Sequence, residues 1–228
     1  MEYVVKHTAT RPELSGCWHG PVWDHAKTLT VERFHPYSSA HRPKTRAKLL
    51  YDDSGIFVFF RVEDQYVRCT HTEYQSAVYR DACVECFIQP KPDKGYFNFE
   101  INCGGTMLLK YIEDARRGPG GFAKSEDVPW PLAKQVQIYH SLPHIIDPEI
   151  THPVDWFIEY AIPRAFFEEY IGPMGELRGQ QWRANLYKCA EDNSHPHWAT
   201  WAPIGEELNF HQPERFGVVR FEATSEVS

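Results

Sequence analysis

Three glutamates lie inside otherwise apolar segments, where a carboxyl group is expected to have a specific task. They are Glu85 in the segment 83–89, Glu100 in the segment 96–102 and Glu159 in the segment 156–162. An ionised carboxylate among apolar side chains is costly unless it is paired or faces a wet cavity. These glutamates are therefore the first candidates for chemistry.

Glu85 and Glu100 are candidates for different kinds of site. Strict alternation in the segment 96–102 places Glu100 between Asn98 and Asn102 on one face of a strand. Such a polar row is either a solvated sheet face or a polar floor that hydrogen-bonds a polyhydroxylated ligand. A glycoside hydrolase working through Glu85 and Glu100 would need their carboxyl groups about 5–10 Å apart, and the sequence alone does not give that distance.

The segment 195–203, HPHWATWAP, combines two histidines with two tryptophans. Trp198 and Trp201 point to opposite faces of an extended strand. One of them is therefore expected in the core and the other at a rim. His195 and His197 point to one side, as a pair of metal ligands would. Surface histidines beside a turn produce the same pattern, and no third ligand is predictable, so no metal residue is assigned.

The other metal-ligand patterns are short. Cys83 and Cys86 form a lone CxxC, half of a zinc site, on a strand where positions three apart face opposite sides. Reduced thiols packed in strands fit them better. The acidic pairs 52–53 and 191–192 offer the oxygen ligands that calcium prefers, but they also suit turns. No cofactor is predicted outright, and calcium stays a candidate.

The composition limits the partners. The net charge is −7, with 24 Lys and Arg scattered along the chain, so nucleic acid and anionic membranes are not expected partners. No apolar run approaches the roughly 20 residues of a membrane span. Residues 1–6 contain no apolar signal core, so the chain as it stands is expected to be cytoplasmic, or extracellular or periplasmic if it is a trimmed mature form.

The periodicity predicts an all-β fold. About ten strands are expected, at 48–51, 56–62, 83–89, 96–102, 106–111, 135–139, 156–162, 182–189, 198–201 and 216–221. The nearly apolar segment 56–62 is expected to be buried on both faces. A short helix is predicted over 164–170, another near 22–27, and a long irregular loop over 113–131. Together these elements predict a single domain, 1–228, built as one antiparallel β-sandwich of the jelly-roll type.

Several segments in order resemble the family 9 carbohydrate-binding modules, within the wider DOMON-like group of β-sandwiches. The segments are AKLLYDDSGIFVFFRVED, RDACVECFIQP, GYFNFEIN, DWFIEYAIPRAFF, QWRANLYKC and HWATWAP, followed by NFHQPERFGVVRF, and they cover roughly residues 45 to 221. The resemblance implies a sandwich that binds the end of a glucan or xylan chain, often with structural calcium. It also places Trp201 on a framework strand, which leaves Trp198 at the rim of the site.

The resemblance also implies which residues form the site. In the family a terminal sugar lies between two tryptophans, and the corresponding positions here are Val78 or Tyr79 and Phe210. The glutamate of the family's Val-Glu strand corresponds to Glu85, and an arginine on the next strand corresponds to Glu100. The polar positions of the 182–189 strand fall around Asn185 and Tyr187. The predicted ligand-binding residues are Tyr79, Glu85, Asn98, Glu100, Tyr187, Trp198, Asn209 and Phe210.

The expected function is non-catalytic binding of the end of a plant-type or bacterial saccharide, beside a glycoside hydrolase. Three alternatives stay open. One is a glycoside hydrolase that uses Glu85 and Glu100. Another is b-type haem binding, for which Met1, Met107 and Met174 are the available methionine ligands. The last is a purely structural or partner-binding sandwich.

Overall fold

The computed structural model describes residues 1–223, and the regular secondary structure of this part of the chain is mostly β. This part of the chain contains seventeen strands rather than the ten predicted, and the last five residues of the predicted domain lie outside it. The strands are β1 (Glu2–His7), β2 (Leu29–Val31), β3 (Arg33–Phe34), β4 (Lys44–Asp52), β5 (Gly55–Asp64), β6 (Val67–Cys69), β7 (Cys83–Gln89), β8 (Tyr96–Asn102), β9 (Met107–Leu108), β10 (Lys110–Gly118), β11 (Gly121–Asp127), β12 (Gln137–His140), β13 (Ile146–Ile150), β14 (Val154–Pro163), β15 (Gln181–Ala190), β16 (His197–Thr200) and β17 (Gly217–Phe221). Most of the missed strands are two or three residues long or strongly polar, so they carry little alternation.

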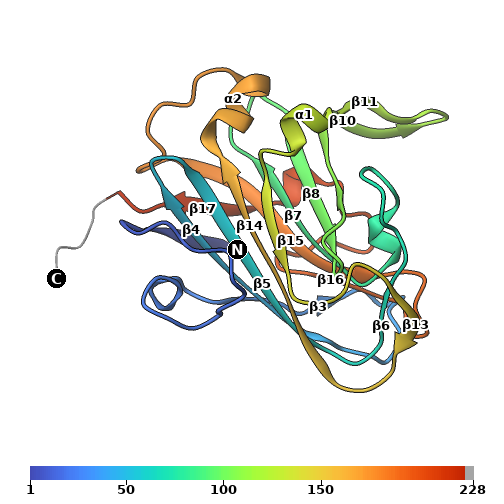
Figure 1. The fold of residues 1–228 in the computed structure, drawn as a ribbon. Helices are drawn as coiled ribbons and strands as arrows, with labels where there is room; N and C mark the ends of the chain where they lie inside the picture. Colours follow the sequence, from blue (N-terminus) through green and yellow to red (C-terminus); the bar gives the residue numbers. More distant parts are fainter. Residues whose placement is uncertain (224–228) are drawn as a thin grey trace.

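Fifteen strands form one continuous hydrogen-bonded sheet, and β6 pairs with β13 separately (Figure 1). The main path runs β11-β10-β8-β7-β15-β17-β1-β4-β5-β14-β12. The pairing is antiparallel except at β1, which runs parallel to both β17 and β4. The prediction of a purely antiparallel sheet is therefore wrong at this strand. Because its two neighbours are far along the chain, no hairpin fixes the direction of β1.

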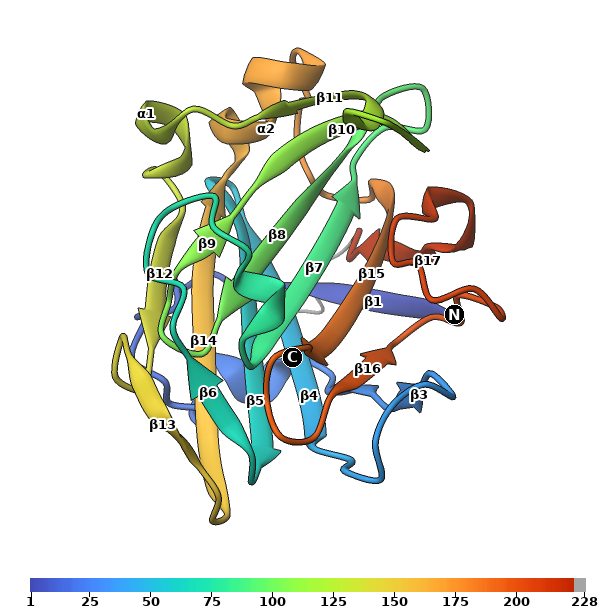
Figure 2. The same ribbon diagram turned by 90° about the vertical axis from the view of Figure 1, so that its right-hand side faces the viewer.

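The sheet folds over at β1 so that its two halves lie in two layers (Figure 2). Phe97 and Phe99 point into the core between the layers, as the alternation predicts. The Phe99 ring lies 6.3 Å from the ring of Tyr160 on β14, centroid to centroid, which joins β8 to the opposite layer. The opposite face of β8 therefore carries Asn98 and Glu100 away from the apolar core.

The outer face of the other layer is covered by the N-terminal segment. Trp18 and Trp23 pack edge-on against Phe59, with ring centroids 5.0 and 5.1 Å away. These rings belong to a second apolar cluster that also contains Phe57. The prediction that β5 is buried on both faces is confirmed, since its residues from Gly55 to Phe60 are all buried.

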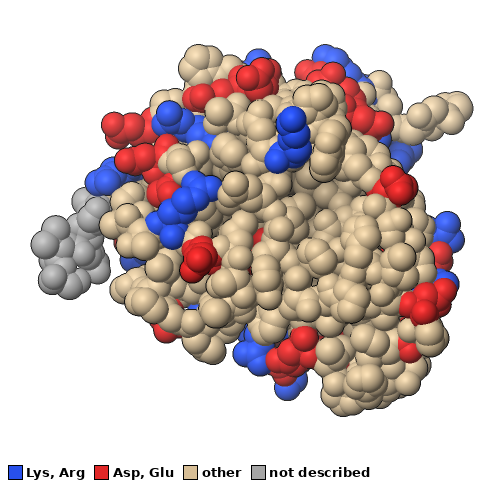
Figure 3. All heavy atoms as spheres, viewed as in Figure 1, with Lys and Arg blue, Asp and Glu red and all other residues tan. Residues whose placement is uncertain are grey.

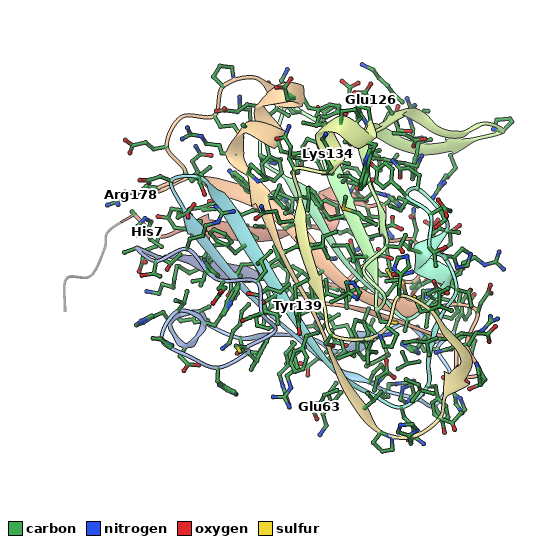
Figure 4. All side chains as sticks on the ribbon, viewed as in Figure 1. His7, Glu63, Glu126, Lys134, Tyr139 and Arg178 are labelled. Carbon is green, nitrogen blue, oxygen red and sulfur yellow. The ribbon has the colours of Figure 1, made fainter. Side chains whose placement is uncertain are left out.

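Glu159 fastens this N-terminal segment to β14. Its carboxylate accepts hydrogen bonds from Trp23 Nε1 at 2.9 Å and from the backbone N–H groups of Ser15 and Gly16 at 3.0 and 2.9 Å. Gly16 has φ +73°, and a Cβ there would lie 2.5 Å from the ring of Tyr139, the side chain labelled near the centre of Figure 4. Glu159 is thus a structural residue, paired by hydrogen bonds.

We expect Glu159→Gln to lower the free energy of unfolding by about 1–2 kcal/mol, because a glutamine presents only one acceptor oxygen to three donors. Urea unfolding of the variant measures the change. The matched control is Asp155→Asn on the same strand, where, within residues 1–223, the exposed carboxylate pairs only with Arg61, at 2.7 Å. A Glu159→Gln cost no larger than that of the control would show that the carboxylate does not hold the segment.

A buried ionic cluster lies at the end of the core near β6. Lys188, which is fully buried, donates to His197 Nε2 at 2.7 Å and lies 3.6 Å from Asp64 Oδ2. Asp64 Oδ1 is 2.7 Å from His41 Nε2, and Trp156 Nε1 donates to Asp64 Oδ2 at 3.3 Å. Burial alone would raise the pKa of Asp64, but the Lys188 cation and the His41 hydrogen bond outweigh it and lower that pKa. Asp64 is therefore ionised in the folded protein.

The structure corrects the prediction of a long loop over 113–131. Most of this stretch forms the two-stranded ribbon β10–β11, in which Lys124 pairs with Glu113 at 2.6 Å and Gly118 lies opposite Gly121. Cross-strand ion pairs occupy the exposed faces, so the strands lack the apolar alternation that identifies a strand in a sequence.

The helices are short. The predicted helix after residue 163 is confirmed as α2 (Arg164–Ile171), and the one near 22–27 is a 3₁₀ turn, η1 (Trp23–His25). The helix α1 (Trp130–Ala133) and the 3₁₀ turns η2 (Val78–Arg80) and η3 (Pro213–Arg215) complete the set within residues 1–223. None of the described helices is long and apolar enough to span a membrane. On the surface shown in Figure 3, positive and negative side chains are interspersed.

Candidate functional site

A cleft of about 420 Å³ opens on the outer face of the layer that contains β7, β8 and β15. Side chains from η2, the β10–β11 ribbon, β16 and the segment 208–211 surround it. Seven of the eight predicted ligand-binding residues line this cleft: Tyr79, Glu85, Asn98, Glu100, Trp198, Asn209 and Phe210. The eighth, Tyr187, does not line it.

Two carboxyl groups form the floor of the cleft. Glu85 on β7 and Glu100 on β8 are directly opposite each other in the strand register, and their exposed fractions are 2% and 5%. Glu85 Oε1 accepts a hydrogen bond from the Cys189 thiol at 3.1 Å, and Glu100 Oε1 accepts one from Asn98 Nδ2 at 2.7 Å. Asn98 is held in turn by the backbone N–H of Lys110, which donates to its Oδ1 at 2.6 Å.

Burial sets the charge state of this floor. It raises the pKa of Glu85 well above the usual range, helped by the neighbouring Cys189 and Glu100. It raises the pKa of Glu100 to about 8, even though the Asn98 hydrogen bond acts in the opposite direction. Among residues 1–223 neither carboxyl group has an ion-pair partner. The floor is therefore largely protonated near neutral pH, and each carboxyl group offers an O–H donor as well as acceptor oxygens.

The raised pKa of Glu100 predicts that the fold loses stability as the pH rises from mildly acidic values to about 8. A carboxyl group whose pKa is higher in the folded than in the unfolded state stabilises the fold at low pH, and this contribution disappears as the pH rises through the folded value. We expect the wild type to lose roughly 3–4 kcal/mol of unfolding free energy between about pH 5 and pH 8, and Glu100→Gln to lose distinctly less. Urea titrations across this range, with Glu13→Gln as the exposed control, measure both slopes. Parallel slopes would contradict the assignment.

Aromatic side chains form the walls above this floor. Tyr79 is 37% exposed, and Phe210 is half-buried. Phe210 stacks on Tyr187 with ring centroids 4.1 Å apart and ring planes 12° apart, and the Tyr187 hydroxyl donates to the Phe210 carbonyl at 2.8 Å. Tyr187 thus supports Phe210 from below and does not face the cleft. Sequence alternation places Tyr187 on the face of β15 that carries the cleft. It does not show that Phe210 and its neighbours cover the Tyr187 ring.

The two tryptophans of the segment 195–203 occupy different environments. Trp201 is 4% exposed and belongs to the main core. Trp198 is half-buried at the cleft, and its Nε1 donates to Glu191 at 3.3 Å. Asn209 lines the cleft while its Oδ1 accepts the backbone N–H of His211 at 2.9 Å, which fixes the turn that carries Phe210. The cleft therefore combines a polar floor with aromatic walls.

The model of carbohydrate-binding family 9 matches residues 23–221. The chain belongs to this family. Among curated proteins none matches the chain. A solved Bacteroides uniformis protein, provisionally assigned as carbohydrate-binding, is similar with a TM-score of 0.81 and 25% identity over 97% of this chain and 99% of that one.

Two further solved structures share the fold of this family 9 chain. Both are of a family 9 carbohydrate-binding module from Caldicellulosiruptor kristjanssonii. The complex with cellotriose has a TM-score of 0.62 at 14% identity, covering 99% of this chain and 96% of that one. The complex with glucose has a TM-score of 0.61 at 13% identity, covering 99% and 98%. Membership of the family makes non-catalytic carbohydrate binding the function of the chain.

Several residues that line the cleft of this family 9 protein were missed in the sequence. Those with polar or aromatic side chains are Lys110, Arg117, Phe122, Glu191 and His211. Arg117 lies 3.9 Å above the Phe122 ring within the unpredicted ribbon. His211 Nδ1 is 2.8 Å from the Tyr96 hydroxyl, and burial lowers the pKa of His211 to about 3, so the ring is neutral. An aromatic residue in an otherwise polar stretch, Phe122, is the one signal that could have drawn attention to this segment.

The interpretation of the two histidines as surface residues is wrong for His197, whereas His195 is partly exposed. His197 is fully buried against Lys188, and burial together with that cation lowers the pKa of His197 to about 3. His195 stacks on Tyr66 with ring centroids 3.6 Å apart. The reason is the alternation itself, which turns His197 toward the core beside Lys188 on the adjacent strand.

The described residues offer one metal-like group, Cys83, Glu85 and Cys189, whose ligand atoms lie within 4.8 Å of one another. Two sulfur atoms do not suit calcium, which prefers oxygen ligands. Burial raises the pKa of the Cys83 thiol to about 12, so it stays protonated. Within residues 1–223 the acidic pairs are engaged elsewhere, since Asp52 accepts the backbone N–H of Ser54 at 2.7 Å and an Asp192 oxygen lies 2.8 Å from Arg80 Nε. These residues do not fit a calcium site.

Proposed function

We propose that the protein holds the terminal unit of an oligosaccharide or polysaccharide in this cleft. Tyr79, Phe210 and Trp198 offer the flat apolar surfaces on which the C–H groups of a sugar ring stack. Glu85 and Glu100 offer hydrogen-bonding groups for the hydroxyls. The single observation that carries the proposal is the convergence of these side chains on one open cleft of about 420 Å³, a size ordinary for a small-ligand site.

The state of the carboxyl groups favours binding over hydrolysis. A retaining or inverting glycoside hydrolase needs one ionised carboxylate beside one protonated carboxyl group. The pKa values of Glu85 and Glu100 are both raised, so both groups are largely protonated near neutral pH and neither is the required base. Haem binding has no comparable support, because Met107 and Met174 are both buried in the main core.

Two finer features belong to the same proposal. The two packed layers support the placement of the fold in the DOMON-like group of β-sandwiches, which the sequence resemblance implies. A module of this kind is expected to act beside a glycoside hydrolase on the same saccharide, in whichever compartment that saccharide occurs. A cytoplasmic location for the chain as it stands, or an exported one for a longer form, remains part of the proposal.

Calorimetric titration tests the proposal. The folded protein is titrated with monosaccharides and with β-1,4-linked disaccharides and trisaccharides of glucose and xylose. We expect the protein to bind the end of a saccharide chain. The disaccharide and the trisaccharide should then bind with similar affinity, with one site per protein. Absence of heat with every saccharide, for a sample that shows a cooperative thermal transition, would contradict the proposal.

A further inference from the structure

The floor of the cleft has an excess of acid over base. Glu85 and Glu100 face each other across adjacent strands, a register in which Cβ atoms lie about 4.5–5.5 Å apart. Glu191 lines the same cleft, and in the described structure its carboxylate accepts a hydrogen bond from the Trp198 indole N–H. Each of these carboxyl groups lacks an ion-pair partner among residues 1–223.

The two cations that line the cleft form no ion pair with its carboxyl groups in the described structure, although both lower the pKa of Glu100. Lys110 forms an ion pair with Asp127 on the neighbouring strand. Arg117 is exposed in the β10–β11 ribbon and lies over the Phe122 ring. The third basic residue in the lining, His211, is neutral because burial lowers its pKa. Among residues 1–223 the carboxyl groups of the floor therefore have no ion-paired cation, and Lys110 and Arg117 affect Glu100 only by lowering its pKa.

We propose that Glu85 and Glu100 select a sugar unit that carries a free, protonated amino group. This inference rests on the proposed function, because it assigns a ligand class to the same cleft. An ammonium group on the floor donates charge-assisted hydrogen bonds to one ionised carboxylate and to the carbonyl oxygen of its protonated neighbour. The aromatic walls add to the selection, since a cation within about 6 Å of an aromatic ring face is attracted to it. An N-acetylated or neutral sugar offers no charge to this floor.

Binding of the ammonium group changes the protonation of the floor. The empty cleft holds protonated carboxyl groups, so an entering cation makes ionisation favourable and drives a proton into solution. The titratable or charged groups that surround the pair in the described structure are Tyr79, Cys83, Tyr96, Lys110, Arg117, Tyr187, Cys189, Glu191 and His211. Release of about one proton per bound amino sugar is expected near pH 6, where an amine of ordinary basicity is protonated.

The experiment compares β-1,4-linked disaccharides that differ only at C2. The probes are cellobiose, the glucosamine disaccharide and its fully N-acetylated form, with a disaccharide containing glucuronic acid as the anionic probe. Calorimetry at about pH 6, in two buffers of different ionisation enthalpy, gives both the affinity and the proton release. We expect the glucosamine disaccharide to bind about tenfold or more tightly than cellobiose, with the advantage shrinking at high salt.

Matched variants connect the preference to the two carboxyl groups. In Glu85→Gln and Glu100→Gln the ratio of the glucosamine to the cellobiose affinity is expected to fall toward one. In Glu159→Gln, where a buried glutamate holds the N-terminal segment, the ratio is expected to stay at its wild-type value. Thermal unfolding shows whether each variant is folded. If the floor variants do not fold, proton release by the wild type still decides the question.

The outcomes distinguish failure of the amino-sugar preference from failure of saccharide binding itself. Equal affinity for cellobiose, the N-acetylated form and the free amine would overturn the inference and leave saccharide binding intact. Tighter binding of the glucuronic acid probe would overturn it as well, because the cations at the rim would then dominate. Absence of binding to all four probes by folded protein would contradict both the inference and the proposed function.

Discussion

Lys188→Met is expected to lower the free energy of unfolding by about 3–5 kcal/mol. The Lys188 ammonium is fully buried between Asp64, at 3.6 Å, and His197, at 2.7 Å. It also donates to the Cys189 carbonyl at 3.0 Å. Methionine fills a similar volume but removes the charge, which leaves the Asp64 carboxylate buried without its main cation. Equilibrium unfolding in urea measures the loss.

Two further variants separate this charge effect from a packing effect. Lys44→Met removes an exposed lysine whose Nζ lies 3.7 Å from Glu63, and such a surface pair is worth less than about 1 kcal/mol. Adding Asp64→Asn to Lys188→Met removes the uncompensated charge, so the double variant should recover part of the loss. If Lys188→Met costs no more than Lys44→Met, the buried cluster does not stabilise the fold as described.

The contrast between the buried glutamates shows what a sequence can and cannot provide. Alternation correctly turns Glu100 away from the core, because the two-residue period of a strand is a local property. The same local property cannot separate Glu159, which holds the N-terminal segment, from Glu85, which lines the cleft. Their tasks depend on Trp23 and Cys189, which are more than 100 residues away from them in the chain.

The errors have a related cause. The β10–β11 ribbon was predicted as a loop because its exposed strands satisfy their polar side chains across the pair rather than burying an apolar face. His197 was read as a surface residue because its partner, Lys188, is itself a residue type that rarely occurs in a core. In the β10–β11 ribbon and at His197, polar side chains are stabilised by other polar side chains. A hydropathy pattern does not reveal such pairs.

The resemblance to a family predicted which residues of different strands and loops lie close together. The periodicity of a single strand carries no such information. The resemblance placed Tyr79 and Phe210 on opposite sides of one site, and both line the cleft. It did not show that Tyr187 lies beneath Phe210, which follows from the path of the segment 204–216 in this chain. Substitution of Phe210 tests whether these residues contact a saccharide.

Phe210→Ala is expected to weaken saccharide binding by about tenfold or more, because the variant removes the ring that forms one wall of the cleft. The backbone of this wall should stay in place. The Tyr187 hydroxyl donates to the Phe210 carbonyl, and Asn209 fixes the following turn, so neither contact needs the Phe210 ring. The loss should therefore appear in affinity with a small change in thermal stability.

Calorimetry with the tightest disaccharide of the panel measures this loss, and two variants make the result specific. Phe210→Trp keeps a flat ring over Tyr187 and should retain binding, whereas Tyr37→Ala removes a ring that is 75% exposed and does not line the cleft, and should leave binding unchanged. An affinity of Phe210→Ala within about twofold of the wild type would mean that the sugar does not stack on this wall. In that case Tyr79 and Trp198, on the other sides of the same floor, would have to provide the apolar contact, and the terminal unit would lie closer to η2 than to the segment 208–211.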